Sequence, residues 1–152
     1  MARNVFYSFH FDNDFSRTHQ VRNMNAFTQN SHPKANEWES LKRTGKEAVR
    51  RWIDASLKGT SCTVVLIGSE TASRPWVIEE ICRSWDAKKG VVGVYIHGLK
   101  DLNGNTDNKG LNPFEQVHFH HEGRKIVLSE ILADYDPPGW DSKAVYKDIG
   151  DN

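Results

Sequence analysis

A carboxylate and an indole are spaced in this sequence so that they could hold one small ligand between them. Glu80 follows Trp76 by four residues in the segment 76–89, where apolar residues at helical spacing predict a helix. Residues four apart lie on the same face of a helix, so this carboxylate and this indole would lie side by side. The adjacent Glu79 would point about 100° away around the helix and is the weaker candidate.

A carboxylate in this position suits the cleavage of a bond between a sugar and a nitrogen base. Breaking an N-glycosidic bond builds oxocarbenium charge on the ribose. A nearby carboxylate stabilises that charge and accepts hydrogen bonds from the ribose hydroxyls. The alternative interpretations are a solvated helix carboxylate for Glu80 and a core anchor for Trp76.

The end of the first predicted strand, residues 4–9, offers a second group of candidates. Parallel sheets bind ligands beyond the carboxyl ends of their strands, which is where this group falls. Backbone amides and ring stacking there could meet a nucleotide, and Arg17 or Arg22 could pair with a pyrophosphate. The alternatives are core packing for the aromatic rings and solvation for the arginines. The predicted substrate contacts in this group are Ser8, Phe9, His10, Asp12 and Arg17.

Two further side chains and a histidine cluster complete the candidate set. Ser69 directly follows the predicted strand 61–68, and we expect it to contact the substrate. Trp38 lies in an otherwise polar loop, where it could stack on a ligand or pack as a lid. The histidine cluster consists of His118, His120 and His121. A metal site would need a further ligand that the sequence does not supply, so we favour a polar surface strand and predict no metal site.

These candidates depend on strands and helices that alternate along the chain. Continuous apolar segments predict buried strands of a parallel sheet, and helical spacing predicts the helices between them. The predicted strands are 4–9, 61–68, 91–96 and 125–128, and the predicted helices are 12–25, 41–58, 76–89 and 141–149. Residues 26–40 predict a loop with one weak edge strand, and residues 99–112 predict a mobile surface loop. The alternation indicates an α/β domain.

Composition favours a single domain over residues 1–152. The 20 Lys and Arg residues balance the 20 Asp and Glu residues, so no net charge favours nucleic acid or membranes as partners. No apolar segment approaches the roughly 20 residues that span a bilayer, and no secretory signal pattern opens the chain. We therefore expect a cytoplasmic protein in which Cys62 and Cys82 are reduced, buried and unreactive.

Two segments resemble the Toll/interleukin-1 receptor (TIR) domain family. The opening NVFYSFHFDNDFSR, residues 4–17, resembles a TIR opening in which a strand ending Ser-Phe leads to an acidic turn and an arginine. The segment SETASRPWVIEEI, residues 69–81, resembles the TIR segment that carries Ser, Trp and then Glu. The VLIGS strand end and the Gly-Leu-Asn-Pro-Phe tract at 110–114 are similar to the TIR-like ThsB family of the bacterial Thoeris antiphage system.

This resemblance implies a flavodoxin-like or TIR-like three-layer α/β sandwich with a central, mainly parallel β-sheet. It implies that Glu80 is the catalytic glutamate and that NAD⁺ is the substrate, with no cofactor. Cleavage would release nicotinamide and form a cyclic or conjugated ADP-ribose signal that activates an effector protein during phage infection. TIR domains also assemble with one another, so the resemblance implies a homo-oligomer held by TIR–TIR contacts.

Two other functions compete with the enzymatic one. A non-catalytic TIR adaptor would act only by assembly with other TIR domains, and the loop after the first helix matches ordinary TIR domains poorly. A nucleoside deoxyribosyltransferase has a related α/β architecture and also uses a glutamate at a ribose. We place it last because the sequence shows no set of residues suited to reading a nucleobase.

Overall fold

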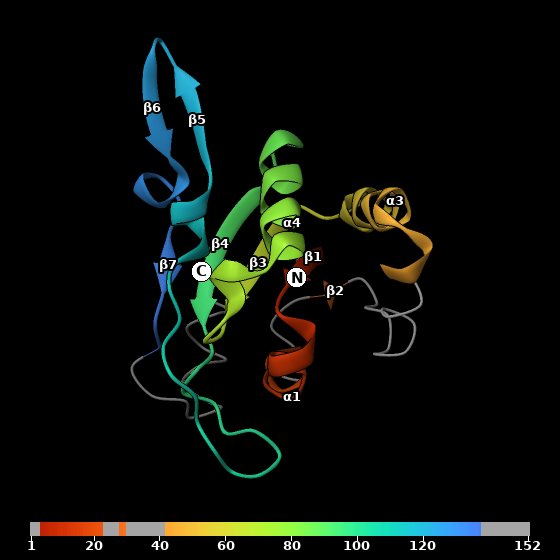
Figure 1. Ribbon diagram of the computed structural model, residues 1–152, viewed down its shortest axis with the longest axis vertical. Helices are drawn as coiled ribbons and strands as arrows, with labels where there is room; N and C mark the ends of the chain where they lie inside the picture. Colours follow the sequence, from red (N-terminus) through yellow and green to blue (C-terminus); the bar gives the residue numbers. More distant parts are fainter. Residues whose placement is uncertain (1–3, 23–27, 30–41, 138–152) are drawn as a thin grey trace.

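The computed structural model describes residues 4–22, 28–29 and 42–137, and it places a parallel β-sheet at the centre of the molecule (Figure 1). The sheet has five strands in the order β2-β1-β3-β4-β7, and the neighbouring strands pair in parallel. The strands are β1 (Asn4–Ser8), β2 (Thr28–Gln29), β3 (Cys62–Ile67), β4 (Gly90–Tyr95) and β7 (Asp134–Tyr135). Because β1 lies beside β3 and β3 beside β4, the segments that follow these strands gather at one edge of the sheet.

Helices connect the strands, and one hairpin stands apart from the sheet. The α-helices are α1 (Phe11–Arg22), α3 (Lys46–Leu57) and α4 (Pro75–Asp86), and the 3₁₀ helices are η1 (Thr71–Ser73), η2 (Pro113–Gln116) and η3 (Leu128–Glu130). Strands β5 (His118–His121) and β6 (Arg124–Val127) pair in an antiparallel hairpin that projects away from the sheet (Figure 1).

Side-chain alternation along the strands gives the sheet two apolar faces. On one face, Val64 and Leu66 of β3 belong to a core cluster that includes Val21 of α1. On the opposite face, Val65 and Ile67 of β3 belong to a cluster that includes residues of α4. Helices thus cover both faces of the parallel sheet. The predicted three-layer α/β sandwich with a central, mainly parallel sheet is confirmed.

Helix α3 covers the second face where β1 lies. Phe6 packs there against Val49 and Ile53, which recur on one side of the helix as an amphipathic pattern requires. The predicted helix 41–58 is confirmed, although α3 itself begins at Lys46. Gly59 follows its end with φ 80°, a conformation that suits the predicted glycine stop.

The predicted helix 76–89 ends too late. Helix α4 stops at Asp86, and Lys88 takes the left-handed conformation after it, with φ 60°. Gly90 does not close the helix as expected. It opens β4 instead, where its N–H donates to the carbonyl oxygen of Ser61 at 3.1 Å. Lysine has a good helix propensity, so Lys88 and Lys89 gave no sign that the helix ends at Asp86.

The predicted position of the last strand of the sheet was also wrong. Residues 125–128 were expected to form it, but β6 pairs with β5 outside the sheet, and β7 occupies the edge beside β4. A two-residue strand is too short to show a period of two, so no pattern could reveal β7. The weak edge strand expected within 26–40 is confirmed as β2, parallel to β1. The predicted helix 141–149 lies outside the described residues.

Both cysteines are more accessible than predicted. Cys62 and Cys82 are free thiols of intermediate burial. Burial, with the nearby charges of Glu79 and Asp86, raises the pKa of the Cys82 thiol, so its protonated form is favoured at neutral pH. The prediction that both side chains are buried was wrong, because Cys62 stands at the less buried start of β3 and Cys82 lies off the inward stripe of α4.

Candidate functional site

Glu80 and Ser8 meet at the carboxyl end of β1. The Ser8 hydroxyl donates a hydrogen bond to Oε1 of Glu80 at 2.7 Å. Ser8 is fully buried and Glu80 is only 6% exposed. The contact joins the two segments that the sequence singled out separately, although 72 positions separate them along the chain.

The helical period of α4 explains why a glutamate is buried here. Its inward stripe consists of Val77, Glu80, Ile81 and Ser84. Val77 and Ile81 anchor this stripe in the core, so the polar residues between them also face the sheet. Each polar residue has a hydrogen-bond partner there. Glu80 accepts from Ser8, and the hydroxyl oxygen of Ser84 lies 2.7 Å from that of Thr63. The apolar residues of α4 therefore determine where the carboxyl group points.

Burial raises the pKa of Glu80 to about 8, and the hydrogen bond from Ser8 only partly offsets this effect. The side chain is therefore a neutral acid at pH 7 in this structure. Perturbed carboxyl groups of this kind cluster at functional sites, because catalytic acids and bases need pKa values matched to their task. The alternative of a solvated Glu80 does not hold in the folded chain.

Glu79 has the opposite environment. Its Oε1 accepts hydrogen bonds from Nε of Arg50 at 2.8 Å and from Nε of Arg83 at 3.3 Å. Partial burial opposes its ionisation, but these two guanidinium groups outweigh that effect and lower the pKa of Glu79. Two consecutive glutamates are thus held in different protonation states. This contrast agrees with the helical geometry that made Glu79 the weaker candidate.

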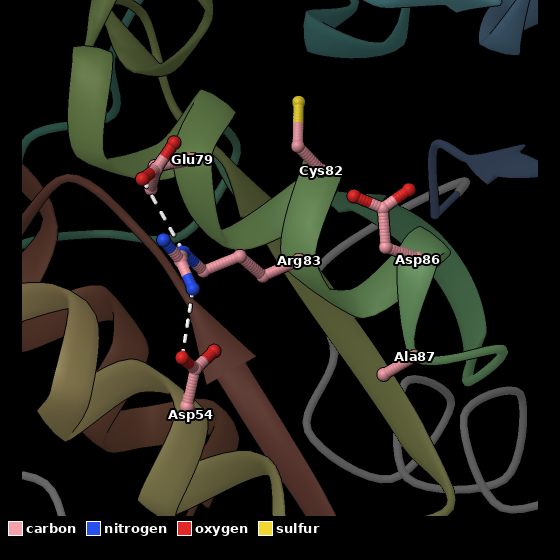
Figure 2. Close-up of a pocket in the computed structure, with 6 residues that line it drawn as sticks. All are labelled: Asp54, Glu79, Cys82, Arg83, Asp86 and Ala87. Carbon is pink, nitrogen blue, oxygen red and sulfur yellow. Dashed lines mark hydrogen bonds and ion pairs between the residues drawn. The ribbon is translucent and has the colours of Figure 1, made fainter.

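An open pocket of about 420 Å³ lies against α4 and Asp54 of α3 (Figure 2). Its lining residues are Asp54, Glu79, Cys82, Arg83, Asp86 and Ala87. Figure 2 shows Arg83 between Glu79 and Asp54, with Nη1 of Arg83 2.7 Å from Oδ2 of Asp54. Arg83 pairs there with both Glu79 and Asp54, and Glu80 does not line the pocket. We therefore place the candidate site at the strand ends.

Trp76 is half-buried and packs beside the core cluster between β1 and α3, together with Trp52. Phe9 is 8% exposed and belongs to the cluster on the face that α1 covers, opposite to Ser8. Both aromatic residues thus have the packing roles that were their alternative interpretations. His10 is also buried, at 8% exposure, next to them in the chain. Their contacts with a substrate stay predictions.

The position of Arg17 differs from the exposed one that direct pyrophosphate binding suggests. Its side chain is 4% exposed, and its Nε donates to the carbonyl oxygen of Leu99 at 2.8 Å. Its Nη2 donates to the carbonyl oxygen of Asn105 at 2.9 Å. The 99–107 segment therefore lies against α1 at its base, and Leu102 at its tip is exposed. Asp12 belongs to α1, and Trp38 lies outside the described residues.

The turn after β3 is tied to α1 and to the loop after β4. Ser69 donates its hydroxyl proton to Oδ2 of Asp107 at 2.8 Å. The hydroxyl of Thr71 accepts from the Gly68 N–H at 2.8 Å and lies 3.4 Å from Oδ2 of Asp14. Sequence reasoning missed Thr71 and Asp107 as site residues. Asp14 and Asp107 lie far along the chain from this turn, and Thr71, although it falls within the TIR-like segment 69–81, is not one of the residues that define the motif.

Gly68 occupies a position where no side chain fits. A Cβ at this residue would collide with the carboxylate of Asp14, and a Cβ at Gly110 would collide with the Gly68 carbonyl. We expect Gly68→Ala to lower the free energy of unfolding by about 1–3 kcal/mol, as other overpacking changes do. Thermal melting should show a fall of roughly 3–10 °C.

Gly90→Ala is the matched control for Gly68→Ala, because a Cβ at Gly90 would make only ordinary contacts, the nearest at 3.6 Å from the Ser61 carbonyl oxygen. It should melt within about 2 °C of the unsubstituted protein. Equal melting temperatures for both variants would show that the Asp14 side chain moves freely away from Gly68.

The histidine cluster lies on the projecting hairpin. His118, His120 and His121 are exposed residues of β5. The rings of His118 and His120 pack edge to face, 5.6 Å apart, so they share one side of the strand as expected. Within the described residues no group of three His, Cys, Asp or Glu side chains is placed to hold a metal ion. The interpretation as a polar surface strand is confirmed.

A parallel sheet covered by helices on both faces, with a buried glutamate of α4 bonded to the end of β1, defines a TIR-like α/β domain. The family model of the Thoeris protein ThsB, TIR-like domain, matches residues 6–101, which is more than half of the chain. The chain therefore belongs to the ThsB TIR-like family.

A curated relative agrees with this assignment. The chain is 37% identical over 138 residues to ThsB1 of Bacillus cereus (strain MSX-D12), and the match covers 86% of this chain and 71% of the relative. That relative is named as a candidate cyclic ADP-D-ribose synthase. Among the helices of the described residues, none is long and apolar enough to cross a membrane.

Proposed function

We propose that this chain is an enzyme that cleaves NAD⁺ at its nicotinamide glycosidic bond and makes a cyclic or conjugated ADP-ribose signal. The observation that carries the proposal is the buried carboxyl group of Glu80, held by Ser8 at the carboxyl end of β1. Ligands of parallel α/β sheets bind at this edge. The name of the ThsB1 relative points to the same chemistry.

The reaction breaks the bond between C1′ of the ribose and the nicotinamide nitrogen. The electron pair of that bond leaves with nicotinamide, which becomes neutral, and positive charge develops on the ribose. An ionised Glu80 would stabilise that charge and accept hydrogen bonds from the ribose hydroxyls. In cyclisation a nitrogen of the same molecule's adenine attacks C1′, whereas in hydrolysis water attacks and loses a proton.

The hydrogen bond between Ser8 and Glu80 has to open for this chemistry. As long as Glu80 faces only the Ser8 hydroxyl, burial keeps the acid neutral. Ribose hydroxyls that take the place of Ser8 would supply more donors and favour the ionised form. We therefore expect the catalytic rate to increase as the pH rises toward 8.

The remaining roles follow from this assignment. Ser8 contacts Glu80, Ser69 lies in the turn after β3, and Trp76 lies one helical turn before Glu80 on α4. We propose that all three line the substrate site. Phe9, His10, Asp12 and Trp38 stay predicted contacts. NAD⁺ is the substrate, and no cofactor takes part. The product activates an effector protein in antiphage defence in the cytoplasm, and TIR–TIR contacts assemble the enzyme.

The test is product analysis of NAD⁺ incubated with concentrated protein, by chromatography and mass spectrometry, repeated in lysate from phage-infected cells. Nicotinamide should appear together with an ADP-ribose product, and the mass of that product separates a cyclic form from the hydrolysed one by one water. Intact NAD⁺ under both conditions, with a folded protein, would contradict the proposal. The buried carboxyl group of Glu80, bonded to Ser8, would then be structural, and a non-catalytic TIR adaptor would be favoured.

A further inference from the structure

Arg17 is a buried cation whose environment extends well beyond its own helix. Its side chain lies on α1 and is 4% exposed, yet it donates hydrogen bonds to the carbonyl oxygens of Leu99 and Asn105 in the loop after β4. These positions are 82 and 88 residues away along the chain. A buried guanidinium is costly unless its donors are satisfied, and here the loop backbone satisfies two of its nitrogens.

Three carboxylates surround the same guanidinium. Asp14 and Asp107 lie 3.8 Å from its Nη1, and Asp101 lies 3.9 Å from its Nη2. Asp101 also accepts hydrogen bonds from the backbone N–H groups of Asn103 and Asn105. The loop thus folds around Asp101 while its backbone holds Arg17. These carboxylates would repel an incoming phosphate group, and the N–H donors of Arg17 already face the loop.

Two of these carboxylates lead to the turn that precedes α4. Asp107 accepts from the Ser69 hydroxyl, and Asp14 lies at 3.4 Å from the Thr71 hydroxyl. Residues 69–71 follow β3 and come just before the helix that carries Glu80. Arg17 therefore connects α1, the turn after β3 and the loop after β4, the segments that gather at the carboxyl edge of the sheet.

We propose that Arg17 is a positioning residue of the NAD⁺ site, which holds loop 99–107 and turn 69–71 in place and does not bind the pyrophosphate itself. The proposal rests on the proposed function, because it assigns these two segments to the walls of the substrate site. Small displacements of such walls lower catalysis strongly, since the reacting groups must be aligned closely. The planar guanidinium is suited to this role because its fork of donors reaches several acceptors at once.

Hydrogen–deuterium exchange of the full chain tests the positioning role without any substrate. Arg17→Met should increase exchange in residues 99–107 by roughly tenfold or more, while the core of α3 and α4 keeps its protection. Arg17→Lys retains the charge but not the fork, so its exchange should be intermediate. Unchanged exchange in 99–107 for both variants would overturn the proposal.

Gln20→Ala is the matched control for the exchange experiment. Gln20 also lies on α1 and donates to the same loop, at the Lys100 carbonyl oxygen 2.6 Å away, but its side chain is exposed. Its replacement should leave the protection of 99–107 within about twofold. If Arg17→Met does not fold, Asp107→Asn provides the second variant, because it removes one carboxylate of the network from a partly exposed position.

NAD⁺ kinetics separate positioning from direct pyrophosphate binding. If Arg17 acts by position, Arg17→Met and Asp107→Asn should both lower kcat/KM by roughly tenfold or more, and the double variant should be no worse than Arg17→Met alone. If Arg17 binds pyrophosphate, Asp107→Asn would free the cation, lower the KM for NAD⁺ and overturn the proposal. Absence of NAD⁺ cleavage in the unsubstituted protein would count against the proposed function alone, since the exchange experiment decides the role of Arg17 independently.

Discussion

Replacement of Glu80 by glutamine should abolish nicotinamide release while the protein stays folded. Glutamine has the shape of the neutral acid, and its Oε1 retains the hydrogen bond from Ser8. It does not ionise, so it cannot stabilise positive charge on the ribose. Loss of one such electrostatic contribution lowers a rate by roughly 10²–10³-fold, and a larger loss is expected if Glu80 also positions the ribose hydroxyls. Single-turnover assays of nicotinamide release with saturating NAD⁺ measure the effect.

Glu79→Gln is the matched control for this experiment. It makes the same chemical change one position away, on the side of α4 that faces Arg50 and Arg83. Its kcat should stay within about threefold of the unsubstituted enzyme, because the pairs it breaks are partly exposed and contribute little. If Glu79→Gln and Glu80→Gln lost activity equally, the buried carboxyl group would not be the catalytic one.

Ser8→Ala distinguishes a substrate contact from a simple partner of Glu80. Removal of the hydroxyl leaves a buried carboxyl group without its donor, which favours the neutral acid further. The rise of kcat/KM with pH, which reports the free enzyme, should therefore move to higher pH in Ser8→Ala. The pH dependence of kcat should stay unchanged, because ribose hydroxyls replace Ser8 in the substrate complex. This displacement follows from the hydrogen bond alone and accompanies the Glu80 experiment as a second control.

The sheet and the glutamate were predictable because both follow from local periodicity. The continuous apolar run of β3 and the helical spacing of α4 place Glu80 on an inward stripe between Val77 and Ile81. The same spacing separates Glu80 from Glu79, and the structure gives the two residues opposite environments. The ends of the helices were less predictable, since Gly90 belongs to a strand and not to a helix stop.

The partners within the site could not be predicted from residue types. Arg17 binds carbonyl oxygens of the loop after β4, and a carbonyl oxygen carries no sequence signal. The close approach of Gly110 to the Gly68 carbonyl could not be predicted either, because many surface loops contain glycine. Ser8 at the end of β1 was a candidate. Its hydrogen bond to Glu80 could not be predicted, because it depends on how α4 packs against β1. Long-range geometry of this kind is what the structure adds.

Burial of Glu80 should make the stability of the protein depend on pH. In the unfolded chain a glutamate has its ordinary pKa near 4.5, whereas burial raises the pKa of folded Glu80 to about 8. Between these values the folded state binds the extra proton, so the free energy of unfolding decreases as the pH rises through this range. The contribution is complete below about pH 4.5 and lost above about pH 8. Its size is on the order of a few kcal/mol.

Glu80→Gln should remove this dependence, because glutamine does not titrate. The variant and the unsubstituted protein should unfold at similar denaturant concentrations at pH 5, and the variant should be the more stable by a few kcal/mol at pH 9. Glu79→Gln should behave in the opposite sense, since its arginine partners lower the pKa of Glu79. It should destabilise the protein slightly at pH 7, because its ion pairs are partly exposed, and the difference should shrink as the pH falls below about 4.5. Parallel stability curves for Glu80→Gln and the unsubstituted protein from pH 5 to 9 would show that Glu80 is not buried as a neutral acid.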